Sequence, residues 1–165
     1  MFPPIPGWPG LHPLVVHFPI ALLIFAPLFV VLAIVFSRAR LALAASALVL
    51  MLAGTIGAFV AVEAGEAAAE LADRSEAIAP VLDRHAALAE QTRNLFAVLT
   101  VLYAAALVAP RFTRKKQWDG RAFAAMSVLF LVLYGGGVLL LANTAHQGGL
   151  LVHQFGVRSV VAQED

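Results

Sequence analysis

The sequence contains no cysteine and few charged residues. The lack of cysteine excludes disulfides, thiolate zinc sites, iron–sulfur ligation and covalent attachment of a c-type haem. Charged residues make up 13% of the 165 residues, whereas about a quarter is usual in soluble domains. The net charge is only +1, so no strong field favours nucleic acid, and we expect no nucleic-acid partner.

The first ten residues carry no basic side chain, and the apolar run that follows them is too long for a signal-peptide core. We therefore expect this run to be a retained membrane helix. Hydrophobic residues make up 61% of the chain and the mean hydropathy is +0.88. A small soluble domain cannot bury so much apolar surface, so the composition predicts an integral membrane protein in contact with lipid.

Four apolar stretches are long enough to cross the roughly 30 Å hydrocarbon core as helices. They predict an all-α four-helix bundle in one domain, 1–165, with spans at about 17–36, 41–62, 86–109 and 122–145. Pro27 is expected to kink the first span and Pro110 to end the third. The second helix is expected to continue beyond the membrane to Glu70, and the tail from His146 onward is punctuated by glycine and then polar.

The distribution of lysine and arginine predicts the orientation, because cytoplasmic loops are enriched in them. Seven basic residues and one acid lie in the 37–40 turn and the 111–121 loop, against four basic residues and nine acids at the opposite side. The protein is therefore expected in the bacterial inner membrane, as a multi-pass protein with both termini outside (N-out/C-out).

All five histidines fall on the expected outer side: His12, His17, His85, His146 and His153. Imidazole is the commonest metal ligand and the axial ligand of b-type haem. Ionisable groups at membrane depth are functional by default. The histidines therefore form the candidate site of the sequence.

A haem in a helical bundle needs two facing imidazoles, a slot lined by small and apolar residues, and cations for its propionates. Arg84 and Arg93 are the candidate cations. The candidate slot residues are Gly54, Gly57, Gly135, Gly136, Gly137, Phe18, Phe59, Phe96 and Tyr134. Close helix packing explains the glycines about equally well, and an ordinary core explains the aromatic residues better.

Two other interpretations stay open. The histidines and the face formed by Glu63, Glu66 and Glu70 are of the types that hold a bare metal ion. No helix, however, has the His-x-x-x-His pair of a strong zinc site, and a solvated helix face explains the glutamates better. Alternatively, the histidines handle protons or dock a quinol without a cofactor.

The two ends of the chain resemble the motifs of a bacterial family of small, four-span membrane proteins with a domain of unknown function. The opening motif is His12-Pro-Leu-Val-Val-His17-Phe-Pro-Ile-Ala, and the closing one is His146-Gln-Gly-Gly-Leu-Leu-Val. His85 matches an internal histidine of the family, whereas His153 lies where relatives often have tyrosine. The resemblance covers nearly the whole chain. Relatives occur with Rieske-type and cytochrome c domains, which implies electron transfer.

These observations lead to one hypothesis and one alternative. We expect one or two molecules of haem b, with His17, His85 and His146 as axial ligands and His12 joining if two haems bind. The protein would transfer electrons at the outer face as a subunit of a redox complex, with a c-type cytochrome, a Rieske-type protein or quinol as partner. The alternative is a non-catalytic assembly subunit whose histidines bind a metal ion or a partner.

Overall fold

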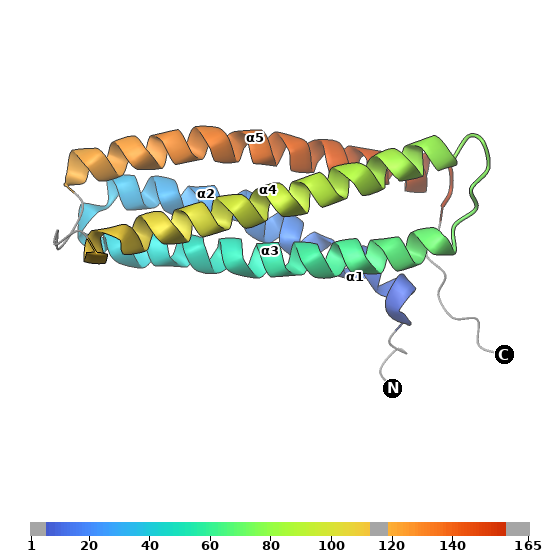
Figure 1. Ribbon diagram of the computed structural model, residues 1–165, viewed down its shortest axis with the longest axis horizontal. Helices are drawn as coiled ribbons and strands as arrows, with labels where there is room; N and C mark the ends of the chain where they lie inside the picture. The colour runs from blue at the N-terminus through green and yellow to red at the C-terminus, as the bar shows by residue number, and fades with distance from the viewer. Residues whose placement is uncertain (1–5, 113–118, 158–165) are drawn as a thin grey trace.

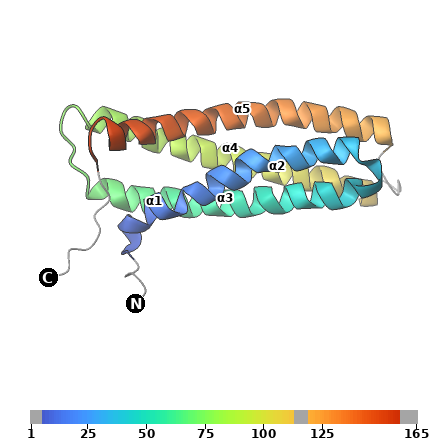
Figure 2. The ribbon, with the colours of Figure 1, turned by 180° about the vertical axis from the view of Figure 1, so that it is seen from behind.

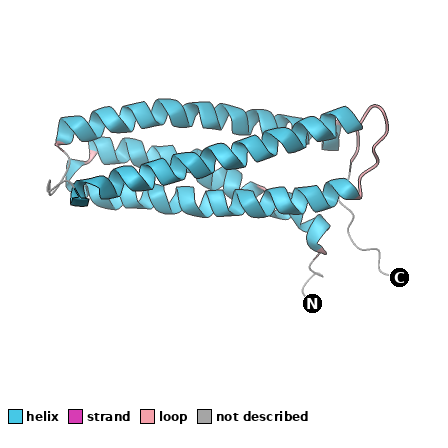
Figure 3. Ribbon diagram, in the orientation of Figure 1, coloured by secondary structure: helices cyan, strands magenta, loops and turns pink. Residues whose placement is uncertain are grey.

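The computed structural model describes residues 6–112 and 119–157, and these are helical almost throughout (Figures 1 and 3). In chain order, the elements are the 3-10 helix η1 (Trp8–Leu11), α1 (His12–Val15), α2 (His17–Val35), the 3-10 helix η2 (Ser37–Ala39), α3 (Arg40–Glu70), α4 (Ala79–Phe112) and α5 (Gly120–His153). No strand occurs in this part of the chain. The predicted all-α class is confirmed.

The four long helices form an antiparallel bundle in which each packs against its neighbours in the sequence, and α5 closes the ring against α2 (Figures 1 and 2). All four are long and apolar enough to span a membrane. Many of their large apolar side chains are exposed on the outside of the bundle, Leu139 and Phe18 among them. The chain is therefore a multi-pass membrane protein whose outer surface suits lipid.

The helices extend beyond the predicted spans. α3 continues to Glu70 as expected, but α5 runs eight residues past position 145, and its 34 residues measure about 51 Å. The backbone N–H and C=O groups of a helix are paired within the helix itself. The helix can therefore continue unbroken beyond the membrane surface. α4 also continues two residues beyond Pro110, because a proline near a helix end removes only one hydrogen bond. The expectation that Pro110 ends the third span was wrong.

Prolines shape the first span. α1 and α2 are separated by a break at Val16, where Pro19 offers no N–H to the carbonyl four residues earlier. The segment before the break, η1 and α1, packs against α3. The helical part of the first span thus begins at Trp8. This packing brings His12 beside the outer end of α3.

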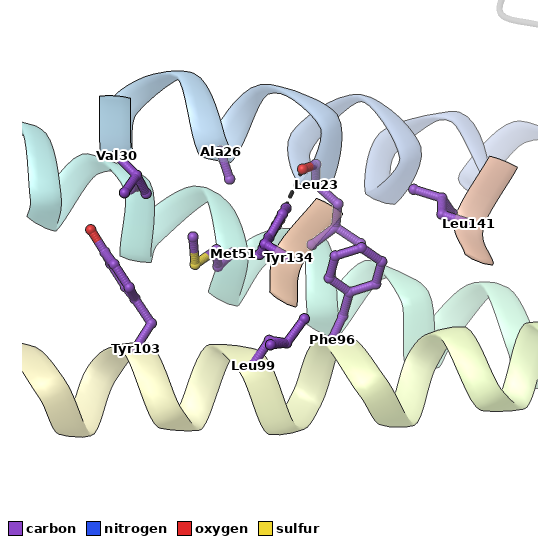
Figure 4. Close-up of a cluster of buried hydrophobic side chains, with 10 residues drawn as sticks. Leu23, Ala26, Val30, Met51, Phe96, Leu99, Tyr103, Tyr134 and Leu141 are labelled. Atoms are coloured by element: carbon purple, nitrogen blue, oxygen red, sulfur yellow. Dashed lines mark hydrogen bonds between the residues drawn. The ribbon is translucent and has the colours of Figure 1, made fainter. Parts of the chain in front are cut away.

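Pro27 leaves a second carbonyl, that of Leu23, without its helical donor. The hydroxyl of Tyr134, on α5, donates a hydrogen bond of 2.8 Å to this carbonyl, as the dashed line in Figure 4 shows. Tyr134 and Leu23 are both buried in the main core cluster. The missing hydrogen bond of the first span is therefore replaced by one from the last.

Small and hydroxyl-bearing residues bring the helices together elsewhere. Gly54 of α3 lies so close to Leu23 that an added Cβ would come within 2.8 Å of it. Thr55 and Thr100 form a buried hydroxyl pair of 2.9 Å between α3 and α4. A second buried pair joins α4 to α5. Such contacts are the usual means of helix association in lipid.

A histidine pair as the candidate functional site

His12 reaches the site from α1, which packs against α3. Its Nδ1 forms a hydrogen bond of 2.8 Å with the carbonyl of Ala61. The ring also lies against Gly65 of α3, where an added Cβ would come within 2.9 Å of both Cε1 and Nδ1. Only glycine leaves room for the imidazole at this position.

His85 has the same surroundings on the other side of the bundle. It belongs to α4, and its Nδ1 forms a hydrogen bond of 3.0 Å with the carbonyl of Thr144 on α5. A Cβ at Gly148 would lie 2.9 Å from its Cε1. The hydroxyl of Thr144 forms a hydrogen bond of 2.8 Å with the hydroxyl of Thr92 on α4. The part of α5 that supplies the carbonyl to His85 is therefore also bonded to α4.

The two imidazole rings lie beside each other. Their ring centroids are 6.3 Å apart and their planes are nearly perpendicular, at 85°. Each Nδ1 is engaged by a backbone carbonyl, so Nε2 is the nitrogen that remains for a ligand. A carbonyl that accepts from one ring nitrogen fixes the tautomer and orients the other nitrogen, as in many metal-ligating histidines.

The pair also has the spacing of a bis-imidazole site. Two imidazoles on opposite sides of one metal ion, bonded at about 2.0 Å, have ring centroids roughly 6 Å apart. The observed 6.3 Å matches that separation. Two imidazoles at this separation are donors of the type that bind a haem iron or a bare metal ion.

The other three histidines have exposed side chains: His17, His146 and His153. They are not among the residues that contact the pair. The described residues contain no group of three or more histidine, cysteine, aspartate or glutamate side chains placed to hold a metal ion. The structure thus brings together two of the five candidates, His12 and His85, and the roles of the other three stay predictions.

The candidate charged residues lie apart from the pair. Glu63, Glu66 and Glu70 are exposed, as a solvated helix face would be. Arg84 is exposed as well. Arg93 packs its guanidinium over the ring of Phe59, 5.1 Å from the centroid, and its Nε donates a hydrogen bond of 3.2 Å to Oδ1 of Asn94.

The expected slot is largely filled by protein. Gly54 and Gly57 accommodate Leu23 and Pro19, and Gly137 accommodates Phe96 and Leu99. Phe96 and Tyr134 pack edge-to-face in the core, with centroids 5.2 Å apart. Gly135 and Gly136 face open space, and Phe18 is exposed. Helix packing therefore accounts for Gly54, Gly57, Gly137, Phe96 and Tyr134.

The residues that fix the two rings are not among those predicted from the sequence. Gly65 and Gly148 make room for them, and Ala61 and Thr144 supply the carbonyls. A signal for Gly148 was present, because it lies in the closing motif after His146. Gly65, between Glu63 and Glu66, had no such signal.

The sequence profile of a family described as a predicted membrane protein (DUF2231) matches residues 9–161. The chain therefore belongs to this family, as the resemblance of its two end motifs indicated. No curated protein and no solved structure matches the chain. The matched range includes both histidines of the pair and both glycines that face them.

Proposed function

We propose that this member of the predicted-membrane-protein family binds one haem b between His12 and His85 and transfers electrons at the outer face of the membrane. The observation that carries the proposal is the pair itself: two imidazoles from different helices, 6.3 Å apart, each with Nδ1 held by a backbone carbonyl. One such pair supports one haem, the lower of the two numbers expected.

The chain's own part in this function is positional. The carbonyls of Ala61 and Thr144 accept from Nδ1 and leave Nε2 of each ring for iron. Gly65 and Gly148 hold the rings edge-on against α3 and α5. When bound, a bis-histidine haem b takes up and releases one electron. Gly54, Gly57 and Gly137 lie against protein side chains, so the macrocycle would lie at the end of the bundle that holds His12 and His85, the histidine end.

The side of the membrane and the partners follow from the sequence. The loop charges favour an outer position for the histidine end. We propose a membrane or extracytoplasmic carrier as partner, of the c-type cytochrome, Rieske or quinol class, in a larger redox complex. No second imidazole pair lies at the other end of the described bundle, so one haem at this end would exchange electrons on one side only.

An absorbance spectrum of the purified protein tests the cofactor. We expect a sharp α-band on reduction and a haem-to-protein ratio of about one, as for a bis-histidine haem. His12→Ala and His85→Ala should each remove or convert the haem. His153→Ala is the matched control, because its side chain is exposed. A folded protein without haem after growth with added haem precursor would overturn the proposal.

The remaining histidines give the ligand assignment a second test. His17→Ala and His146→Ala remove exposed imidazoles and should leave the spectrum unchanged if His12 and His85 are the axial ligands. Loss of haem in the His146→Ala or His17→Ala protein, with retention in His12→Ala, would reject this pair. It would favour the ligands expected from the sequence, which are His17, His85 and His146.

The orientation is tested separately. A reporter enzyme that is active only outside the cytoplasm should work when inserted near Ser75 and fail when inserted near Lys115. In sealed right-side-out vesicles, an impermeant reductant added outside should reduce the haem quickly, and the same reductant trapped inside should not. Reduction from inside alone would place the site at the other face.

A second function is favoured by the compactness of the pair, because rings 6.3 Å apart also suit a small ion. In this case the protein is an assembly subunit whose His12 and His85 hold a bare metal ion. Titration of the haem-free protein with Zn²⁺ or Cu²⁺ separates the two. Tight binding that is lost in both histidine variants, with no haem spectrum from cells, would support the assembly subunit.

A further inference from the structure

Arg40 is the first residue of α3 and lies at the end of the bundle opposite to the histidine end. Ala61, whose carbonyl is bonded to His12, lies about 30 Å further along the same helix. The side chain of Arg40 is partly buried, and its guanidinium lies over the ring of Phe123 of α5, 4.9 Å from the centroid. Arg40 thus bridges α3 and α5, two helices that face each other diagonally across the bundle.

The guanidinium of Arg40 has no bonded acceptor. It offers five N–H donors, and its contact with Phe123 supplies attraction to the ring face but no acceptor in its own plane. In the described part of the chain, Arg74 and Asp83 form the only ion pair, and Nε of Arg40 is buried without a hydrogen-bond partner. Nε is the enclosed nitrogen of the three, so Nη1 and Nη2 are the donors that an acceptor from outside the protein can reach.

The start of α5 adds further donors beside the guanidinium. Nη2 and Nη1 of Arg40 lie 3.5 and 3.8 Å from the position that a Cβ of Gly120 would take, and Gly120 is the first residue of α5. The first N–H groups of a helix have no acceptor within the helix, and they form the positive end of its dipole. Asp119 precedes the helix, but its side chain makes no capping hydrogen bond, and the first turn contains no acid. In the described structure, two positive groups therefore lie side by side, and no carboxylate is bonded to either.

The depth of these groups limits the kind of anion that could bind there. The apolar stretch of the second span begins directly after Arg40, and that of the fourth span begins directly after Arg121. Arg40 and Gly120 therefore lie where the hydrocarbon core meets the headgroup layer. Phosphate groups of phospholipids occur at this depth, and a guanidinium binds phosphate with two N–H groups at once. The loop charges favour this end as the cytoplasmic one, where anionic lipids make the membrane surface negative.

We propose that Nη1 and Nη2 of Arg40, together with the N–H groups at the start of α5, bind the phosphate of an anionic phospholipid headgroup. The bound phosphate would connect the first residue of α3 to the first turn of α5, so the lipid should stabilise the bundle at this end. The site lies far from His12 and His85 and does not depend on the proposed haem. Lipid binding should therefore be unchanged in the His85→Ala protein.

Titration of the purified protein in neutral-detergent micelles with phosphatidylglycerol tests the proposal, with bound lipid counted by native mass spectrometry. We expect one molecule to bind more tightly than any further ones and to raise the melting temperature. Arg40→Gln should weaken this binding about tenfold or more, the value of a hydrogen bond to a charged group, and should abolish the shift of the melt. Arg38→Gln is the matched control, because Arg38 is exposed in the preceding turn and its loss changes the net charge equally. It should weaken binding by no more than about twofold.

Two comparisons separate a phosphate site from general attraction. Arg40→Lys keeps the charge but loses the planar pair of donors, and it should bind phosphatidylglycerol with an affinity between those of the natural protein and Arg40→Gln. Equal weakening by Arg38→Gln and Arg40→Gln would show a plain basic face and overturn the proposal. Inorganic phosphate should compete only weakly. If it binds as tightly as phosphatidylglycerol does, the site takes a soluble anion, and the assignment to a lipid is overturned.

Asp119 provides the remaining test, because its carboxylate stands next to Gly120 and is the rival partner for Arg40. Under the proposal, Asp119→Asn removes a competing negative charge. It should strengthen phosphatidylglycerol binding and leave the melt of the lipid-free protein unchanged. If Asp119→Asn instead lowers the lipid-free melting temperature as Arg40→Gln does, and leaves lipid binding unaltered, the two side chains form an ion pair and the proposal is overturned.

Discussion

The two ends of the bundle differ in whether their buried polar groups have hydrogen-bond partners. At the histidine end, His12, His85, Thr92 and Thr144 all have hydrogen-bond partners. At the opposite end, the hydroxyl of Tyr103 and Nε of Arg40 are buried without one. Satisfied buried groups hold a fixed geometry, whereas unsatisfied buried groups lower the stability of the fold. The comparison separates an end whose buried polar groups are all paired from an end that holds two unpaired ones in the described part of the chain.

The largest effect is expected where an imidazole meets a glycine. Gly148→Leu places side-chain atoms in the space of the His85 ring, and overpacking of this kind costs up to about 3 kcal/mol. Gly149→Leu is the matched control, because nothing lies within 4 Å of its added Cβ, and both variants gain the same helix propensity. Equal unfolding free energies in mixed micelles would show that the histidine end is less rigid than described.

The two tyrosines should respond with opposite signs. Tyr134→Phe leaves the carbonyl of Leu23 without a donor and should lower the free energy of unfolding by about 1–2 kcal/mol. Tyr103→Phe removes an unpaired hydroxyl and should be neutral or stabilising. A comparable loss in both variants would mean that Tyr103 has a partner, and the contrast between the two ends would fail.

The threonine pairs should show a smaller effect. In a double-mutant cycle with Thr92→Val and Thr144→Val, the hydroxyl pair should contribute about 0.6 to 1.7 kcal/mol, as interhelical hydrogen bonds in membranes do. The same cycle on Thr55 and Thr100 provides the comparison within the middle of the bundle. If only the first pair alters the haem or metal affinity, the polar contacts at the histidine end support the site as well as the fold.

The smallest effect is expected for Arg93, which packs over Phe59. A cation–π contact at a partly exposed position contributes about 0.5–1 kcal/mol. Arg93→Gln should therefore change the thermal melt only slightly and leave the haem content unchanged. A large loss of haem in this variant would show that Arg93 contacts the cofactor, as the sequence analysis expected.

The sequence was sufficient for the architecture because apolar length and composition determine membrane spans directly. It predicted four helices, the extension of α3 to Glu70 and the position of all five histidines on one side of the membrane. It could not select His12 and His85 from five histidines. That choice depends on the break before Pro19 and on the register that sets each ring against Gly65 or Gly148. Such register between distant helices leaves no local pattern in one sequence.

The hydrogen bond between Tyr134 and Leu23 joins residues 111 positions apart, and this separation has a consequence for biosynthesis. The span that contains Pro27 enters the membrane first, with a carbonyl that no donor of its own helix can reach. Its donor arrives only with the last span. An incomplete chain, truncated before α5, would carry this bare carbonyl inside the bilayer, where unsatisfied backbone groups cost several kcal/mol. The hydrogen bond at the kink of the first helix would thus form only after the chain is complete and its last span is in the membrane.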